Sequence, residues 1–280
     1  MASATDTLTL GGEREVHRLG FGAMRITGDG IWGEPADPVG ARELLRHVVG
    51  AGVDLIDTAD SYGPQVSENL IAEALSPYSD ELTIATKGGL ERPGPGRWEP
   101  ACRPERLKRC CEDSLRRLKL ERIDLYQLHT VDPKVPIEDS VGALAELQQE
   151  GKIRLIGVCN VTVEELERAQ QIAPIVSVQN RYNFAERRSE EVLQACEQQG
   201  LGFMPWRPLA VGDLAKPGGS LDELARSHDA SPGQVALAWL LAHSPVMLPI
   251  PGTSSIAHFD ENLEAAELEL SQDELEALES

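Results

Sequence analysis

Short apolar runs along the chain alternate with longer segments in which apolar residues recur about every 3.6 positions. The short runs are typical of buried strands, and the longer segments are typical of amphipathic helices. The predicted strands cover residues 19–24, 53–59, 82–87, 123–129, 153–160, 175–180, 201–206 and 246–252. The predicted helices cover residues 38–52, 67–76, 104–120, 136–152, 162–173, 188–200 and 231–244. This alternation predicts a parallel sheet with helical crossovers.

Signals at the helix ends agree with this pattern. Thr162 and Glu165 have the spacing of a capping box, and Gly200 stands where a helix is expected to stop. Eight strands that alternate with helices in 280 residues predict an α/β fold, a (β/α)8 TIM barrel formed by residues 1–280 as a single domain. The alternative is an open, doubly wound sheet. The first predicted strand, "LGFGAM", argues against it because it lacks the GxGxxG fingerprint of a dinucleotide-binding turn.

Two segments lie outside this alternation, and a third forms a long connection within it. Residues 8–16, "LTLGGEREV", predict a β-hairpin that turns at Gly11 and Gly12 and plugs the N-terminal mouth of the barrel. The segment "SQDELEAL" near the end of the chain predicts a C-terminal helix. Residues 88–103 are rich in Gly and Pro and predict a long loop after the third strand. Loops of that length are often functional.

Composition narrows the class of protein. The net charge of −20 opposes general binding to nucleic acid or to an anionic membrane. No apolar run approaches the roughly 20 residues of a membrane helix, and no secretory signal is visible. The five cysteines are irregularly spaced, which favours reduced thiols and a cytoplasmic location. No CxxC or HExxH pattern occurs, so the sequence predicts no metal site.

Polar side chains stand at the ends of most predicted strands. Asp57 ends the second strand within an apolar run, and a buried carboxylate is costly unless it is paired. Lys87, at the end of the third strand, is the partner that we expect. Active sites of TIM barrels lie at the C-terminal ends of the strands. One mouth of the barrel is therefore expected to gather Asp57, Tyr62, Lys87, His129, Cys159, Asn160, Gln179, Asn180, Trp206 and Arg207.

Several motifs, taken in order, resemble the aldo-keto reductase superfamily over nearly the whole chain. They are "DLIDTADSYG", "TK" after the third strand, "YQLH", "GVCNV", "VQNRYN" and "PIPGTSS" followed by "ENL". The segments "LGFGAM" and "YSDELTIATK" are similar to a bacterial subgroup that includes pyridoxal reductase. The resemblance implies a barrel that binds a nicotinamide cofactor across its mouth and reduces aldehydes and some ketones to alcohols.

A tetrad of Asp57, Tyr62, Lys87 and His129 carries over from the family. The resemblance implies that Tyr62 is the general acid, and that Lys87 lowers its pKa from the usual value of about 10. Asp57 would hold Lys87 charged and in place. Neutral His129 would orient the substrate carbonyl.

Cofactor residues are implied in the same way. Asn160 and Gln179 match the family's partners of the nicotinamide carboxamide, and Trp206 replaces the usual stacking Tyr. Cys159 replaces a customary Ser, and a thiol is a weaker donor. Arg207 replaces a Ser beside the pyrophosphate. The complete set implied for the cofactor is Gly22, Met24, Asp57, Asn160, Gln179, Trp206, Arg207, Pro208, Leu209, Thr253, Ser254, His258, Glu261 and Asn262.

The adenosine end departs most from the family pattern. Gly252 and His258 stand where many members have a Lys and an Arg that grip the 2′-phosphate of NADPH. Thr253, Ser254 and Ser255 remain as donors before an expected helix N-terminus, which favours a phosphate. We therefore expect a weakened preference for NADPH, with NADH as the second cofactor. Protonation of His258 at lower pH should strengthen that preference.

The substrate is expected to be a small carbonyl compound, with pyridoxal as a specific case. The chain ends soon after its last helix, which predicts an open pocket walled by the 88–103 loop, Trp32 and Trp98, with Tyr62 and His129 at its base. A monomer is the family's usual form. Two other functions are possible for such a barrel: a non-catalytic subunit that senses nicotinamide nucleotides, and an aldolase that uses Lys87 as a Schiff base. The aldolase leaves Tyr62 and Trp206 unexplained, and the intact tetrad argues against the sensor.

Overall fold

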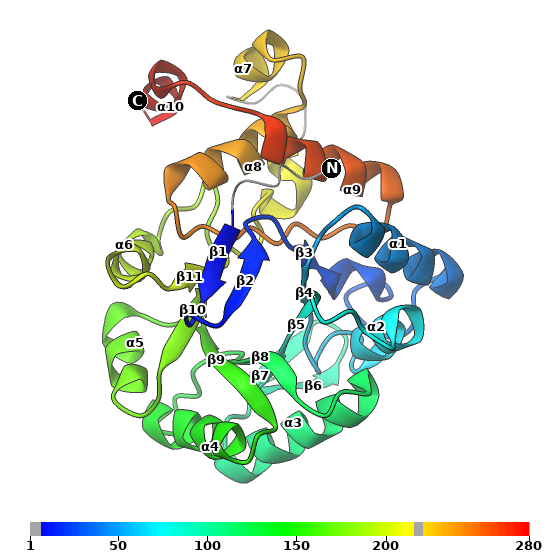
Figure 1. The fold of residues 1–280 in the computed structure, drawn as a ribbon, viewed down its shortest axis with the longest axis vertical. Coiled ribbons are helices and arrows are strands. Elements are labelled where there is room, and N and C mark those ends of the chain that lie inside the picture. Colours follow the sequence, from blue (N-terminus) through cyan, green and yellow to red (C-terminus); the bar gives the residue numbers. More distant parts are fainter. Residues whose placement is uncertain (1–6, 216–220, 280) are drawn as a thin grey trace.

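The computed structural model describes residues 7–215 and 221–279, in which a ring of helices surrounds parallel strands (Figure 1). Neighbouring strands of the sheet are parallel and follow one another in chain order. The sheet contains β3 (Phe21–Gly22), β4 (Leu55–Asp57), β5 (Thr83–Gly88), β8 (Ile123–Leu128), β9 (Ile153–Cys159), β10 (Ile175–Gln179) and β11 (Gly202–Phe203).

Helices follow the strands and cover the outside of the barrel (Figure 1). The α-helices are α1 (Pro38–Gly50), α2 (Val66–Leu75), α3 (Pro104–Leu118), α4 (Ile137–Gln149), α5 (Val163–Gln170), α6 (Glu190–Gln199), α7 (Asp222–Ser227), α8 (Pro232–His243), α9 (Ile256–Glu264) and α10 (Gln272–Glu279). Short 3-10 helices are η1 (Ala23–Ile26), η2 (Ala210–Ala215) and η3 (Ala265–Glu267). The predicted capping box is confirmed at Thr162, and α10 confirms the C-terminal helix. None of the described helices is both long and apolar enough to cross a membrane.

The eighth side of the barrel is an extended segment, residues 246–251. On one edge, the Phe203 amide donates a hydrogen bond to the Val246 carbonyl at 2.9 Å. On the other edge, the Gly20 amide donates to the Pro249 carbonyl at 2.9 Å. Prolines in the segment have no N–H to donate, so its ladder is incomplete. The segment still joins β11 to β3, which confirms the predicted barrel; the open sheet is wrong.

The N-terminal hairpin consists of β1 (Thr7–Leu10) and β2 (Arg14–His17) and lies across one mouth of the barrel (Figure 1). Its turn uses Gly11 and Gly12 at φ of 60° and 71°. A Cβ added to Gly11 would lie 2.8 Å from Val176 of β10, so the turn packs closely against the strands. Leu10 and Val16 are buried in the apolar core inside the barrel. The predicted plug is confirmed.

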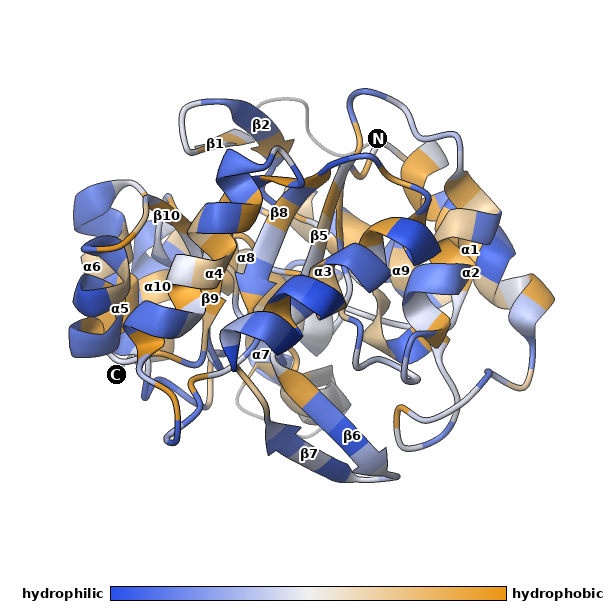
Figure 2. Cartoon of the chain, turned by 90° about the horizontal axis from the view of Figure 1, so that it is seen from below, coloured by the Kyte–Doolittle hydropathy of each residue, from blue (hydrophilic) through white to orange (hydrophobic). Residues whose placement is uncertain are grey.

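Residues 88–103 are not the irregular loop that their Gly and Pro content predicts. They contain an antiparallel hairpin of β6 (Leu90–Gly94) and β7 (Arg97–Pro100), with Glu91 opposite Glu99. Figure 2 shows this hairpin at the end of the barrel opposite to β1–β2. Its prolines fit because the two strands form a separate two-stranded sheet, in which many N–H groups need no ladder partner.

Candidate active site

A buried ion pair joins two neighbouring strands at the C-terminal mouth. Asp57 is the last residue of β4, and Lys87 lies near the end of β5. Lys87 Nζ donates hydrogen bonds to Asp57 Oδ2 at 2.6 Å and to the Thr58 carbonyl at 2.8 Å. The Lys87 and Asp57 side chains are 0% and 3% exposed. Burial lowers the pKa of Lys87, but the Asp57 carboxylate and its hydrogen bond to the ammonium outweigh this effect, so the pKa is raised and the ammonium stays charged.

The second oxygen of the Asp57 carboxylate is held by two amides. Its Oδ1 accepts hydrogen bonds from Gln127 Nε2 at 3.1 Å and Gln179 Nε2 at 2.9 Å. Cys159 Sγ lies 3.8 Å from Gln127 Oε1, within reach of a weak thiol donor. Gln127 was missed from the sequence, although it precedes His129 by two residues and so shares its face of the chain. This network fixes the carboxylate that in turn holds Lys87.

Tyr62 follows β4 in a loop and points toward this ion pair. Lys87 Nζ donates to its phenol oxygen at 3.3 Å. The pKa of Tyr62 is nevertheless raised to about 12, because burial disfavours the phenolate more than the charge of Lys87 favours it. Lys87 does lower this pKa, as expected, but its effect is smaller than that of burial. Asp57 adds to the upward shift, since its negative charge also opposes the phenolate.

His129 follows β8 and lies beside Tyr62, with ring centroids 5.8 Å apart. Its Nδ1 is 3.3 Å from the Ser61 hydroxyl, a contact that the sequence did not indicate. Burial lowers the pKa of His129 well below its usual value, and the positive charges of Lys87 and Arg92 lower it further. The imidazole is therefore neutral near pH 7, in the form that the family resemblance implies. The four predicted tetrad residues thus lie together at one mouth.

Trp206 is held at this mouth by Asn160. The indole Nε1 donates to Asn160 Oδ1 at 2.9 Å, and Asn160 Nδ2 donates to the His129 carbonyl at 3.0 Å. Asn160 has a φ of 57°, in the left-handed region that Asn tolerates. Arg207 is exposed, and its guanidinium lies 5.4 Å from the Trp206 ring centroid. Of the residues that follow it, Pro208 is buried and Leu209 is half-buried.

The N-terminus of α9 lies at the end of residues 246–251 and supplies the predicted helix start. Ser255 is its N-cap and accepts a hydrogen bond from the His258 amide at 3.4 Å. Thr253 Oγ1 accepts from the Ser255 amide at 3.1 Å. Ser254 and the His258 side chain are exposed at this end. Glu261 and Asn262 are half-buried further along the same helix.

Gly22 and Gly252 pack backbone to backbone beside α9. A Cβ at Gly252 would collide with the Gly22 carbonyl, so the Lys common in the family cannot occupy this position without moving the chain. Arg25, an exposed residue of η1, has its Cγ 3.7 Å from the point where that Cβ would lie. Met24 is half-buried next to it. Sequence reasoning missed Arg25 because its nearness to Gly252 depends on barrel closure.

Aromatic side chains stand beside Tyr62 and His129. The Trp98 ring, carried by β7, lies 6.4 Å from the Tyr62 ring and 6.5 Å from the His129 ring, centroid to centroid. Arg92 of β6 lies over the Trp98 face, with Cζ 3.6 Å from the centroid, and is 5.4 Å from the centroid of Trp32. Trp32 and Trp98 are both half-buried.

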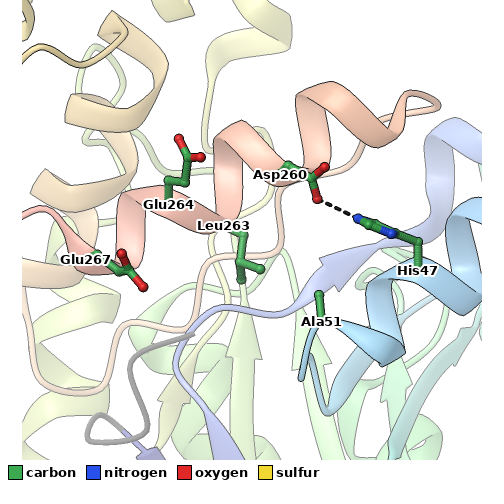
Figure 3. A pocket seen from close by; sticks show the side chains of 6 residues that line it. All are labelled: His47, Ala51, Asp260, Leu263, Glu264 and Glu267. Carbon is green, nitrogen blue, oxygen red and sulfur yellow. Dashed lines mark hydrogen bonds and ion pairs between the residues drawn. The ribbon is translucent and has the colours of Figure 1, made fainter. Parts of the chain in front are cut away.

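Of two further pockets, one lies away from this cluster and the other borders it through Ser61 and Arg92. One, of about 340 Å³, lies between α1 and α9, where His47 Nε2 is 2.6 Å from Asp260 Oδ1 (Figure 3). The second, of about 320 Å³, lies behind the Tyr62 loop and is lined by both acidic and basic side chains, including Asp60 and Arg106. Within residues 7–215 and 221–279, no three His, Cys, Asp or Glu side chains are grouped so that they could hold a metal ion.

Comparison with known proteins agrees with this geometry. The aldo/keto reductase family model matches residues 18–280. An uncharacterized oxidoreductase of Schizosaccharomyces pombe is 50% identical over 276 residues, which cover 97% of this chain and 90% of the relative. Pyridoxine 4-dehydrogenase of Escherichia coli is 43% identical over 281 residues, covering 98% of both.

Solved structures extend the likeness to the fold. An aldo-keto reductase from Klebsiella pneumoniae in complex with NADP and acetate has a TM-score of 0.83 and 27% identity, covering 98% of this chain and 94% of that one. Motifs, barrel, clustered tetrad residues and relatives all agree. The chain therefore belongs to the aldo/keto reductase family, oxidoreductases that act on carbonyl and CH–OH groups with NAD(P).

Proposed function

We propose that this enzyme reduces small aldehydes and ketones to alcohols with NADPH, using Tyr62 as the general acid. The observation that carries the proposal is the buried chain of contacts from Asp57 through Lys87 to the Tyr62 hydroxyl. The cofactor, when bound, supplies a hydride to the carbonyl carbon. Negative charge then develops on the carbonyl oxygen, and the protein must supply a proton there.

Tyr62 is suited to donate that proton. With a pKa near 12, the phenol is fully protonated at neutral pH. Lys87 lies 3.3 Å from the phenol oxygen, so its charge stabilises the phenolate as the proton leaves. Asp57 keeps Lys87 oriented, and the two glutamine amides keep Asp57 in place. Tyr62 is therefore a weak acid in the resting enzyme. Lys87 helps it to donate its proton as negative charge develops on the phenol oxygen.

His129 is proposed to orient the carbonyl. A neutral imidazole can donate one hydrogen bond to the substrate oxygen while its other nitrogen contacts Ser61 at 3.3 Å. The lowered pKa keeps this form present across the neutral range. Tyr62 and His129 would then form two donors to one oxygen, which is the geometry of an oxyanion site.

NADPH fits the described residues at several points. Trp206 offers a half-buried indole face for the nicotinamide, fixed by its bond to Asn160. Arg207 is exposed beside it for the pyrophosphate. The N-terminus of α9 provides N–H groups and a positive dipole end for the 2′-phosphate. Arg25 is the proposed cation at that phosphate, because its side chain lies over Gly252, where the family's Lys would start.

The substrate is proposed to be an aldehyde admitted through an open pocket, and pyridoxal is a specific candidate. The Escherichia coli relative is named as a pyridoxine 4-dehydrogenase, and pyridoxal is the aldehyde that corresponds to that alcohol. Trp98 and Trp32 supply flat apolar walls that suit an aromatic ring. The aldolase alternative is disfavoured because the Lys87 side chain is 0% exposed and Nζ already has three hydrogen-bond partners.

The test is Tyr62→Phe, assayed with NADPH and a panel of aldehydes that includes pyridoxal. Loss of the proton donor should lower turnover by about 10²- to 10⁴-fold, while NADPH binding, followed by fluorescence, stays unchanged. Wild-type turnover in this variant would refute the proposed acid. A wild-type enzyme that binds NADPH but reduces no aldehyde would support the sensor alternative instead.

A further inference from the structure

Arg92 joins three segments that surround the candidate site. It belongs to β6 and is only 8% exposed. Its Nη1 donates to the Ser61 carbonyl at 2.9 Å, next to Tyr62 in the chain. Nε donates to the Arg97 carbonyl across the hairpin at 3.1 Å, and Nη2 donates to the Gly30 carbonyl at 3.4 Å. One side chain thus connects the β6–β7 hairpin, the Tyr62 loop and the loop that carries Trp32.

The guanidinium also fixes the aromatic wall. Its Cζ lies 3.6 Å from the Trp98 ring centroid, a distance at which the cation is in direct contact with the ring face. Trp32 lies on a further side, at 5.4 Å. Lysine cannot reproduce this arrangement, because it has neither the planar group that stacks on a ring nor the forked donors.

We propose that Arg92 is the positioning residue of the substrate pocket: it holds Trp98 and the Tyr62 loop in place around His129. Arg92 does not act on the substrate itself, because it is buried and its donors already serve three carbonyls. Arg92 should therefore affect which aldehydes the enzyme prefers. An aromatic aldehyde that packs on Trp98 depends on Arg92, whereas a short aliphatic aldehyde does so much less.

The positive charge of Arg92 gives a second way to test its role, through the pKa of His129. Among the described residues, the titratable or charged groups that contact His129 or shift its pKa are Tyr62, Lys87 and Arg92. After burial and Lys87, Arg92 is the third influence that lowers the pKa of His129. Removing the positive charge of Arg92 should therefore raise that pKa. The acidic limb of the kcat/KM profile should then move to higher pH, whereas Arg92→Lys, which keeps the charge, should leave it in place.

The experiment compares Arg92→Met and Arg92→Lys with the matched control Arg97→Met. Arg97 lies in the same hairpin, but its side chain is 66% exposed and pairs only with Glu99 among the described residues. For benzaldehyde, both Arg92 variants should lose about 10- to 100-fold in kcat/KM, mainly through KM. For propanal the loss should be severalfold smaller, and NADPH binding should stay unchanged. The control should match wild type with both aldehydes.

A double-mutant cycle with Trp98→Phe tests whether the effect passes through the ring. In that background, Arg92→Lys should cause little further loss with benzaldehyde. Additive losses, or wild-type KM values in both Arg92 variants, would overturn the proposal. If thermal unfolding shows that Arg92→Met does not fold, the test uses Arg92→Lys alone, with and without Trp98→Phe.

The inference rests on the proposed reaction for its kinetics, so it also needs a readout without turnover. Arg92→Lys should change the near-ultraviolet circular dichroism of the free enzyme, and this difference should vanish in the Trp98→Phe background. An unchanged spectrum would contradict the positioning role. If no aldehyde is reduced by wild type, the spectroscopic cycle still decides the role of Arg92, and only the proposed reaction fails.

Discussion

The two mouths of the barrel are made by the same strands but have opposite chemistry. At the N-terminal mouth, Leu55, Ala85 and Leu125 pack with Leu10 and Val16 of the first hairpin in a dry, apolar core. At the C-terminal mouth, the strands end in a buried ion pair, two amides, a phenol and an imidazole. A hairpin covers each end, and Figure 2 shows the two on opposite sides.

Along each strand, the apolar residue of the N-terminal layer and the polar residue of the C-terminal layer are two positions apart. Leu55 precedes Asp57, and Leu125 precedes Gln127, so each pair points to the same face of its strand. The apolar layer stabilises the strands, and the polar layer places charge where it is costly to bury. The residues that stabilise the barrel and the residues of the candidate active site are therefore neighbours in the same strands but are different residues. Substitutions in one layer should change stability, and substitutions in the other should change turnover.

Lys87→Met should give the largest effect, at the polar mouth. Turnover should fall by about 10²- to 10⁴-fold, because the phenolate of Tyr62 loses its stabilising charge. Stability should also fall by about 3–5 kcal/mol, since Asp57 remains buried without its cation. Steady-state kinetics and urea unfolding measure both. Lys108→Met, on the outer surface of α3, is the control. Retained turnover would remove Lys87 from the mechanism.

Leu125→Ala tests the apolar mouth with the opposite expectation. Leu125 is fully buried beneath the N-terminal hairpin, so the cavity should lower the free energy of unfolding by about 2–5 kcal/mol. At a temperature where the variant is folded, kcat should stay close to wild type. A large fall in kcat without a change in stability would show that the two layers are not separable.

Asp60→Asn examines a carboxyl just behind the Tyr62 loop. Burial and the negative charge of Glu68 raise the pKa of Asp60 to about 7, and its Oδ1 has no hydrogen-bond partner among the described residues. A raised pKa in the folded state means that stability is lost as pH rises from the unfolded value near 4 to about 7. Wild type should lose about 1–3 kcal/mol between pH 5 and 7 from this group, and Asp60→Asn should not. Parallel pH profiles of unfolding for the two proteins would contradict this.

Arg25→Ala tests whether Arg25, at the C-terminal mouth, binds the 2′-phosphate of NADPH. Loss of this cation should lower the kcat/KM ratio of NADPH to NADH by about three- to tenfold. His258→Ala should lower the ratio less, because His258 lies at the exposed N-terminus of α9 but, unlike Arg25, not over Gly252. Arg42→Ala, which removes an exposed ion pair between α1 and α2, is the control. A wild-type ratio that favours NADH would overturn the cofactor proposal, and an unchanged ratio in His258→Ala would remove His258 from it.

Cys159→Ser should have the smallest effect. The thiol lies 3.8 Å from Gln127 Oε1, at the limit of a weak hydrogen bond. A hydroxyl would bind the same amide more strongly, so kcat/KM should change by no more than about two- to threefold. A loss comparable to that of Lys87→Met would place the thiol in the reaction itself.

Strand order and the polar strand ends could be predicted from the sequence. Asp57, Lys87 and His129 each end a readable apolar run, and a parallel barrel brings such ends together. Features that depend on contacts between distant segments or on burial could not be predicted from the sequence. The β6–β7 hairpin lies in a Gly- and Pro-rich segment without strand periodicity, and the contacts of Arg92 depend on three loops far apart in the chain. The pKa of Tyr62 rose rather than fell because burial, which a pattern does not measure, exceeds the effect of the nearby ammonium.

The separate sheet formed by β6 and β7 has a consequence for how such enzymes diversify. Its strands pair with each other and with no strand of the barrel, yet the hairpin carries Trp98 to the site. Sequence and length can therefore drift here without disturbing the scaffold, provided that Arg92 or an equivalent anchor is kept. We therefore expect that exchanging this hairpin between relatives, with Arg92 kept, would alter the substrate range and leave the barrel unchanged.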